Sequence, residues 1–159
     1  MASPEAKPAG DSRPDGTGIR VGIVRARWNA EIVDALVEGA GRAIAATGAS
    51  SVEATVPGAF ELPFAASVLA RSGDVDAVVV LGCVIRGETT HYEIVSEGCA
   101  QGVMRVQLDT GVPVGLGIVT VEDHDQALAR SEGEGGHNVG EDATFAAVEM
   151  AVLARSTLR

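Results

Sequence analysis

The segment Ala77–Tyr92 has the sequence AVVVLGCVIRGETTHY, and its first five residues indicate the fold class. The unbroken apolar run Ala77–Leu81 is typical of a parallel strand that is buried on both faces of a sheet. Gly82 and Gly87 follow the run and predict that the strand ends there and passes into a loop. The segment therefore predicts a buried strand, a loop and, after two adjacent threonines, a helix.

The predicted helix begins beside groups that suit an anion. Thr90 and Glu93 have the spacing of a capping box, which places a helix N-terminus at Thr90. Backbone N–H groups at such an end attract anions, and the cationic Arg86 is close by in the sequence. His91 adds a side chain that can accept and return a proton near neutral pH. The same residues therefore predict an anion site with a proton carrier attached.

Strand and helix patterns alternate on both sides of this segment. The predicted strands are Ile19–Val24, Val52–Val56, Asp76–Leu81 and Val112–Thr120. The predicted helices run from a cap at Asn29 to about Gly48, over Phe60–Arg71, after Thr90, after a cap at Asp123, and over Gly140–Leu158. This order implies an α/β fold, a three-layer αβα sandwich around a four-stranded parallel, flavodoxin-like sheet with right-handed crossovers. Residues 19–159 are expected to form a single domain, and residues 1–18 a flexible arm.

Composition excludes several classes of partner. The chain of 159 residues carries a formal net charge of −10, which argues against nucleic acid and anionic membranes. No apolar run approaches about 18 residues, and the N-terminus lacks the apolar core of a secretory signal. Cys83 and Cys99 are not spaced as a metal-binding pair and are expected to be reduced, buried thiols. We therefore expect a cytoplasmic protein.

Ligands of such sheets bind at the carboxyl ends of the strands, where unusual residues of this chain gather. Trp28 follows the first strand and Phe60 the second, and either ring could stack on a planar heterocycle or belong to the core. Arg86 and Arg130 are candidate partners of an anion, although a surface ion pair is the commoner role for each alone. His91 could likewise be an ordinary surface histidine. These residues predict binding of a planar, phosphorylated small molecule but do not identify a reaction.

A second histidine lies in a cluster that resembles a set of metal ligands. His124 is flanked by Asp123 and Asp125. A helix cap on a solvated turn is the commoner use of this pattern, so we interpret Asp123 as a cap rather than as a metal ligand.

Two blocks of the sequence are specific enough to indicate a family. The first is Pro57-Gly58-Ala59-Phe60-Glu61, and the second is Val84-Ile85-Arg86-Gly87-Glu88-Thr89-Thr90-His91. In order and spacing they resemble lumazine synthase, and further matches extend the similarity over about residues 19–155. These further matches are Arg27-Trp28-Asn29, Gly111-Val112-Pro113-Val114, Gln126-Ala127-Leu128-Ala129-Arg130 and Ala147-Val148-Glu149-Met150-Ala151.

The resemblance implies an enzyme activity. The family condenses 5-amino-6-(D-ribitylamino)uracil with 3,4-dihydroxy-2-butanone 4-phosphate to give 6,7-dimethyl-8-ribityllumazine, phosphate and water, the penultimate step of riboflavin biosynthesis. It uses no metal and no organic cofactor. Its basic unit is a pentamer, its sites lie between subunits, and larger multiples of pentamers occur. The resemblance thus implies a homo-oligomer that acts on small molecules, with riboflavin synthase as a candidate partner.

The resemblance also implies roles for individual residues. His91 would transfer protons. The pyrimidine and ribityl pocket would be lined by Trp28, Ala59, Phe60, Glu61, Cys83, Val84, Ile85 and, from a neighbouring subunit, Leu116. The phosphate would be bound by Glu88, Thr89 and Arg130.

Three departures from the family pattern leave alternatives open. Val139 replaces a lysine that faces the phosphate in many relatives, and Leu116 replaces a phenylalanine. The loop Ser131–Gly140 is about one residue longer than in common members, and His137 within it is a candidate substitute for the missing cation. The first alternative is a non-catalytic paralogue that binds lumazine or flavin or forms shells. A second, a flavodoxin-like signalling domain, is disfavoured because the loop Arg25–Arg27 is basic where a phosphoacceptor site would be acidic.

Overall fold

The computed structural model describes residues 13–157 and contains one parallel sheet. Its strands are β1 (Arg20–Ala26), β2 (Ser50–Val56), β3 (Ala77–Ile85) and β4 (Val114–Val121). They lie in the order β2-β1-β3-β4, and each neighbouring pair is parallel. The predicted four-stranded, flavodoxin-like sheet is confirmed.

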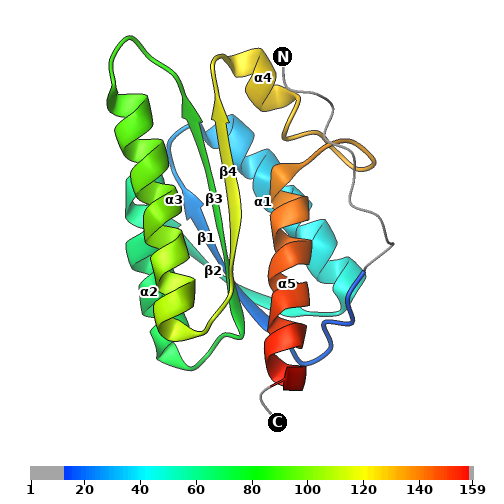
Figure 1. The fold of residues 1–159 in the computed structure, drawn as a ribbon. Helices are drawn as coiled ribbons and strands as arrows, with labels where there is room; N and C mark the ends of the chain where they lie inside the picture. Colours follow the sequence, from blue (N-terminus) through cyan, green and yellow to red (C-terminus); the bar gives the residue numbers. More distant parts are fainter. Residues whose placement is uncertain (1–12, 158–159) are drawn as a thin grey trace.

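Helices cover both faces of the sheet and complete the three layers (Figure 1). They are α1 (Ala30–Thr47), α2 (Leu62–Ser72), α3 (His91–Thr110), α4 (His124–Leu128) and α5 (Val139–Thr157), with a 3₁₀ turn, η1, at Ala59–Glu61. Helices α1 and α5 pack together on one face, and α2 and α3 on the other. In Figure 1 the arrows of β3 and β4 point upward, so the turn before α3 and the short α4 lie at the carboxyl ends of these strands.

Two aliphatic clusters form the core because side chains alternate across each strand. The cluster under α1 and α5 contains Val79 and Leu81 of β3, and the cluster under α2 and α3 contains Val78 and Val80. All four side chains are fully buried. A central strand that is covered on both faces has to be apolar throughout, which is why the run Ala77–Leu81 is a reliable signal.

The strand β3 is longer than predicted. It continues through Gly82, which pairs with Ile118 of β4, and ends at Ile85. A Cβ at Gly82 would lie 3.2 Å from Leu62 Cδ1, so this glycine makes room for α2 instead of ending the strand. The prediction of a break at Gly82 was therefore wrong, and Cys83 and Val84 belong to the strand.

Of the three predicted helix caps, the one at Asp123 is confirmed and the one at Asn29 is not. Asp123 Oδ1 accepts the backbone N–H of Gln126 at 2.9 Å and caps α4. Asn29 precedes α1 but adopts a left-handed conformation (φ 56°) and makes no side-chain cap. Its side-chain nitrogen instead donates to Cys83 O at 2.9 Å. Asn29 therefore joins the end of β1 to the end of β3.

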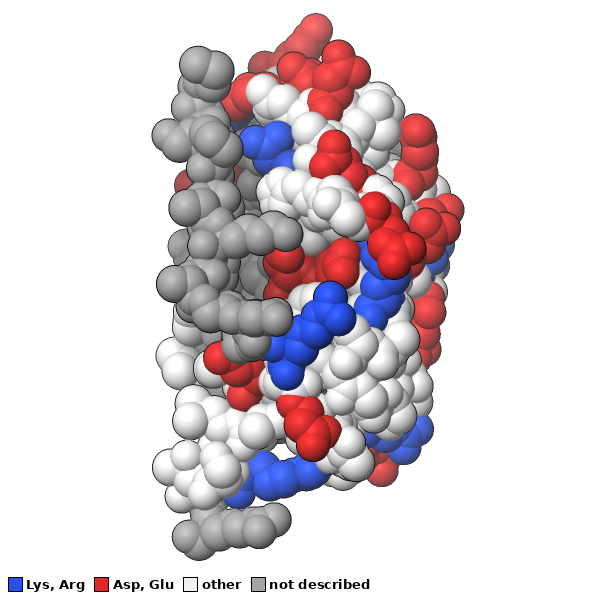
Figure 2. Space-filling view, turned by 90° about the vertical axis from the view of Figure 1, so that its right-hand side faces the viewer, with Lys and Arg blue, Asp and Glu red and all other residues white. Residues whose placement is uncertain are grey.

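Most of the predicted arm, residues 1–18, lies outside the described residues. Within residues 13–18, the buried Gly16 donates its N–H to Thr47 O at 2.7 Å, which attaches this part to the end of α1. Among the described residues, no helix is long and apolar enough to cross a membrane. Figure 2 shows carboxylates over much of the side of the molecule that bears α5, with fewer basic groups among them, as the net charge of −10 requires.

Candidate functional site

The carboxyl ends of β1, β2 and β3 are tied together by hydrogen bonds. Arg27 N donates to Val56 O at 3.0 Å, and Asn29 Nδ2 donates to Cys83 O at 2.9 Å. Beside these bonds is an open hollow of about 260 Å³, lined by Arg27, Trp28, Asn29 and Pro57. The structure thus confirms that loops distant in sequence meet at this edge of the sheet.

Both aromatic residues predicted to bind a heterocycle are exposed. The side chain of Trp28 is 72% exposed and that of Phe60 is 60% exposed, so neither belongs to the core of a single chain. A Cβ at Gly58 would lie 3.1 Å from Trp28 Cδ1, which shows that the indole rests against the loop after β2. A Cβ at Gly98 would lie 2.9 Å from Phe60 Cε2, so this ring rests on α3. Two exposed rings thus lie on backbone surfaces kept open by glycine.

The residues between and beside these rings differ in exposure. Ala59 is buried, while Glu61 is exposed. Cys83 is buried, and burial raises the pKa of its thiol to about 11. A thiol with this pKa stays protonated near neutral pH and is therefore a poor nucleophile. Val84 and Ile85, which end the strand, are half-buried.

The turn between β3 and α3 carries the predicted proton carrier. Glu88, Thr89 and Thr90 are exposed, and His91 is exposed as the first residue of α3. The predicted capping box is wrong, because Thr90 makes no side-chain cap. Instead, Thr89 Oγ1 accepts the backbone N–H of His91 at 3.3 Å. The imidazole therefore stands at a helix N-terminus, on an open turn that lies next to the end of β3.

Arg86 forms ion pairs and is not a free cation. Its guanidinium group pairs with Glu93 and with Glu122, and it lies 4.2 Å from the ring centroid of Tyr92. The hydrogen bond to Glu93 raises the pKa of Arg86 most, and the hydrogen bond to Glu122 raises it further. The Arg86–Glu93 hydrogen bond in turn lowers the pKa of Glu93. Of the two readings of Arg86, the ion pair is confirmed.

Leu116 lies apart from the residues described so far. It pairs with Val80, whereas Cys83 pairs with Val119, three residues further along the strands. At about 3.3 Å per residue this offset is roughly 10 Å. Leu116 is 46% exposed and lines a second hollow, of about 220 Å³, between β4 and α3. The first hollow shares no lining residue with the second.

Arg130 also lies on a different part of the chain. It follows α4, whose buried Ala127 belongs to the core cluster under α1 and α5. The guanidinium Nη1 of Arg130 donates to Gln126 O at 3.0 Å, and the carbonyl of Arg130 accepts the N–H of Val139 at 2.9 Å. Arg130 is half-buried, and Val139 packs against the same core cluster. A local turn therefore fixes the direction of the Arg130 side chain.

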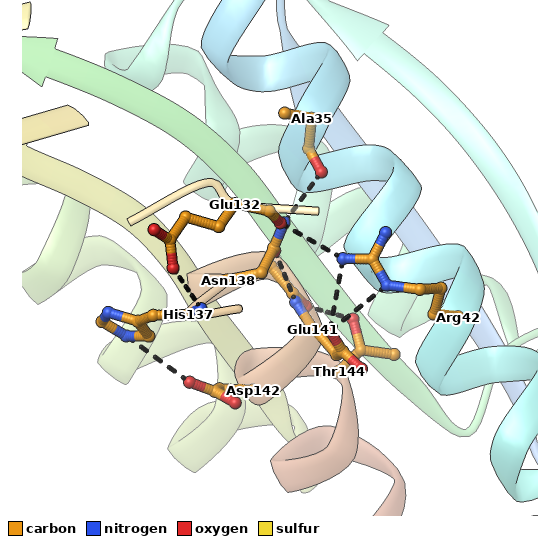
Figure 3. Close-up of polar contacts among 9 residues, drawn as sticks. Ala35, Arg42, Glu132, His137, Asn138, Glu141, Asp142 and Thr144 are labelled. Atoms are coloured by element: carbon orange, nitrogen blue, oxygen red, sulfur yellow. Dashed lines mark hydrogen bonds and ion pairs between the residues drawn. The ribbon is translucent and has the colours of Figure 1, made fainter. Parts of the chain in front are cut away.

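A buried asparagine, which the sequence analysis did not identify, anchors the loop after Arg130 (Figure 3). Asn138 is 1% exposed, and its Nδ2 donates to Ala35 O at 3.0 Å and to Glu132 O at 2.9 Å. Its Oδ1 accepts the N–H of Glu141 at 3.0 Å and so caps α5. Arg42 of α1 pairs with Glu141 at 3.3 Å. The position of Asn138 just before a helical pattern was the sequence signal that could have predicted this cap.

His137, the candidate substitute for the missing lysine, lies beside a carboxylate. Its Nε2 lies 3.7 Å from Asp142 Oδ2 at the start of α5, as Figure 3 shows. Its backbone N–H donates to Glu132 Oε2 at 2.7 Å. Within residues 13–157, no group of three His, Cys, Asp or Glu side chains is placed to hold a metal ion.

One chain therefore presents part of the predicted site. Trp28, Phe60, the end of β3 and the turn bearing His91 share one edge of the sheet. Leu116 lines the separate second hollow, and the Arg130 guanidinium is held in the turn that follows α4. The shared edge offers exposed rings for a flat ligand, backbone N–H groups for an anion and an imidazole for proton transfer.

Comparisons with known proteins identify similar chains. The family model described as 6,7-dimethyl-8-ribityllumazine synthase matches residues 18–155. Proteins with that name from Kineococcus radiotolerans and Xanthomonas euvesicatoria are each 48% identical to this chain, over 153 and 147 residues. These matches cover 92% and 91% of this chain and 94% of each relative. A protein of the same name from Stenotrophomonas maltophilia is 48% identical over 137 residues, 84% of this chain and 88% of the relative.

Proposed function

The chain belongs to the 6,7-dimethyl-8-ribityllumazine synthase family, and we propose that the edge of the sheet around Trp28 and His91 is where it forms the lumazine. The enzyme condenses 5-amino-6-(D-ribitylamino)uracil with 3,4-dihydroxy-2-butanone 4-phosphate and releases phosphate and water. The observation that carries the assignment of the site is the convergence of two exposed aromatic rings and one exposed imidazole on the carboxyl ends of β1, β2 and β3.

The chemistry asks for orientation and proton transfer. Schiff-base formation, loss of phosphate and ring closure each move protons between two bound partners. Holding the partners in register can lower the barrier by several kcal/mol, up to about 7–11. In the proposed site the pyrimidine lies against Trp28 and Phe60, beside Cys83–Ile85. The phosphate meets the turn Glu88–Thr89, and His91 moves the protons.

A direct assay tests this function. The purified chain is mixed with the two substrates, and the absorbance of the lumazine is followed with time. Growth of the lumazine signal in proportion to enzyme supports the synthase. Binding of lumazine or flavin without turnover would instead favour the non-catalytic paralogue.

A complete site requires a second copy of the chain. We propose that a neighbouring subunit supplies Leu116 to the pocket and Arg130 to the phosphate, since Leu116 lines a separate hollow and a local turn holds the Arg130 guanidinium against Gln126 O. Expelling phosphate needs positive potential, and Arg86 is engaged by two carboxylates. Exposed apolar side chains on the outer faces of α2 and α3, among them Phe64 and Leu108, are available for subunit contacts.

The oligomer is a pentamer or a multiple of pentamers in this proposal. Light scattering after size exclusion would then give a mass that is a multiple of five times 16.2 kDa. A mass of one chain in an active preparation would contradict the shared site. The cytoplasmic location and the partnership with riboflavin synthase stay predictions from the sequence.

We expect Val139→Lys to tighten binding of the phosphorylated substrate several-fold. Val139 begins α5 directly after the loop that follows Arg130, and a lysine can keep its stem on the apolar cluster while its ammonium group reaches solvent. The KM for 3,4-dihydroxy-2-butanone 4-phosphate should fall, while the KM for the pyrimidine stays the same. Val139→Gln is the control for a long uncharged side chain, and equal KM values in both variants would refute the expectation.

A further inference from the structure

The turn before α3 is held at both ends by Arg86. The backbone N–H of Arg86 donates to Val121 O at 2.9 Å, which fixes the start of the turn to the end of β4. The side chain pairs with Glu93 in the first turn of α3 and, through Nε at 2.9 Å, with Glu122 beyond β4. Its guanidinium group also faces the ring of Tyr92 at 4.2 Å. One residue thus joins β3, α3 and the segment between β4 and α4.

The residues of the turn between Arg86 and α3 have few other contacts. Gly87, Glu88, Thr89 and Thr90 are exposed, and a Cβ added at Gly87 would meet open space. Apart from the backbone bond Ile94 N to Thr90 O, the hydrogen bond described within the turn is the one from His91 N to Thr89 Oγ1, at 3.3 Å. The conformation of the turn therefore depends on how its two ends are fixed.

The geometry of the contacts suits positioning better than general stability. Exposed ion pairs contribute little to the free energy of unfolding. A planar guanidinium that pairs with two carboxylates and faces a ring nevertheless restricts direction in a way that an ammonium group does not. Nε of Arg86 pairs with Glu122 and Nη1 pairs with Glu93, so these two groups of the guanidinium are engaged by carboxylates.

We propose that Arg86 is a positioning residue of the lumazine-forming site. Its guanidinium group sets the distance and direction of His91, Glu88 and Thr89 relative to the pyrimidine bound at Trp28. This inference rests on the proposed role of His91. It assigns to Arg86 no contact with substrate.

The test compares arginine substitutions at two ends of α3. Arg86→Ala should lower kcat about tenfold and raise the KM for the phosphorylated substrate. A displacement of the turn by a fraction of an ångström would misalign the imidazole of His91 and the phosphate-binding groups of Glu88 and Thr89. The KM for the pyrimidine should change less than about twofold, since Trp28 and Phe60 are untouched. Arg105→Ala is the matched control, because Arg105 pairs with Asp109 at 3.2 Å near the far end of the same helix. Its kinetics should equal those of the parent chain.

Two further variants separate positioning from loss of charge or fold. Arg86→Lys keeps the charge and should recover only part of kcat. Glu122→Gln removes one of the two carboxylates from a well-exposed position, and it should lower kcat in the same direction but by less. The melting temperature of each variant should stay within a few degrees of that of the parent chain. A merely structural role would instead predict that the loss of kcat comes with a loss of stability.

The effect must also pass through His91. In a His91→Asn background, Arg86→Ala should lower kcat by much less than in the parent chain. Full additivity, or parent kinetics in Arg86→Ala while His91→Asn is impaired, overturns the inference alone. Parent kinetics in His91→Asn overturn the proposed role of His91 and this inference with it.

Discussion

His91→Asn should lower kcat by about 10²–10⁴-fold, the usual contribution of a general acid–base. His91 is exposed at the first position of α3, on the same edge of the sheet as the hollow at Trp28. The asparagine keeps a polar side chain of similar size but cannot take up and release a proton near neutral pH. The KM values should change little, because the rings and backbone groups that hold the substrates remain.

The pH profile distinguishes proton transfer from a binding role. The limb of the kcat profile that depends on His91 in the parent chain should disappear in His91→Asn. The control is His124→Asn, which should keep the parent profile, because His124 begins α4 and its Nε2 lies 3.4 Å from Glu31 of α1. A His91→Asn enzyme with parent kcat would remove His91 from the mechanism.

The sequence predicted the fold and the gathering of loops because both depend on local patterns. A strand that is buried on both faces is apolar throughout, so the run Ala77–Leu81 predicts a central strand. The carboxyl ends of parallel strands share one edge, which is enough to bring Trp28, Phe60 and His91 to the same side. Gly82 was misleading because a glycine is needed there for the close approach of Leu62, and no local sequence pattern reveals that contact.

Long-range partners of polar side chains could not be predicted, because they come from distant parts of the chain. The chain contains many carboxylates that could pair with Arg86, and one of its two partners, Glu122, is 36 positions away in the sequence. Asn138 bonds to Ala35, which is 103 positions away. A local pattern can suggest that a side chain will be satisfied but not by which residue. The same reasoning leaves Leu116 and Arg130 as residues whose role is implied by the family resemblance and whose place in the site is a proposal.

The close crossing of α1 and α5 should make Gly140→Ala the most destabilising small substitution at the loop that carries Arg130. A Cβ at Gly140 would lie 2.3 Å from Leu36 O, a backbone atom of α1 that cannot move aside alone. A Cβ at Gly39, on the other helix, would lie 2.2 Å from Asn138 Oδ1. Overpacking of this kind costs about 1–3 kcal/mol and more against backbone, so we expect a loss of about 3 kcal/mol in the free energy of unfolding.

Gly41→Ala is the matched control, because it makes the same chemical change in α1 where a Cβ would meet nothing within 4 Å. Alanine is the better helix former by about 0.5–1 kcal/mol, so this variant should be slightly more stable than the parent chain. Urea unfolding or melting at equal protein concentration measures both changes, and their signs should be opposite. If Gly140→Ala were as stable as Gly41→Ala, the two helices could not cross at these glycines. The anchoring of Asn138 between them, which fixes the loop after Arg130, would then lose its physical basis.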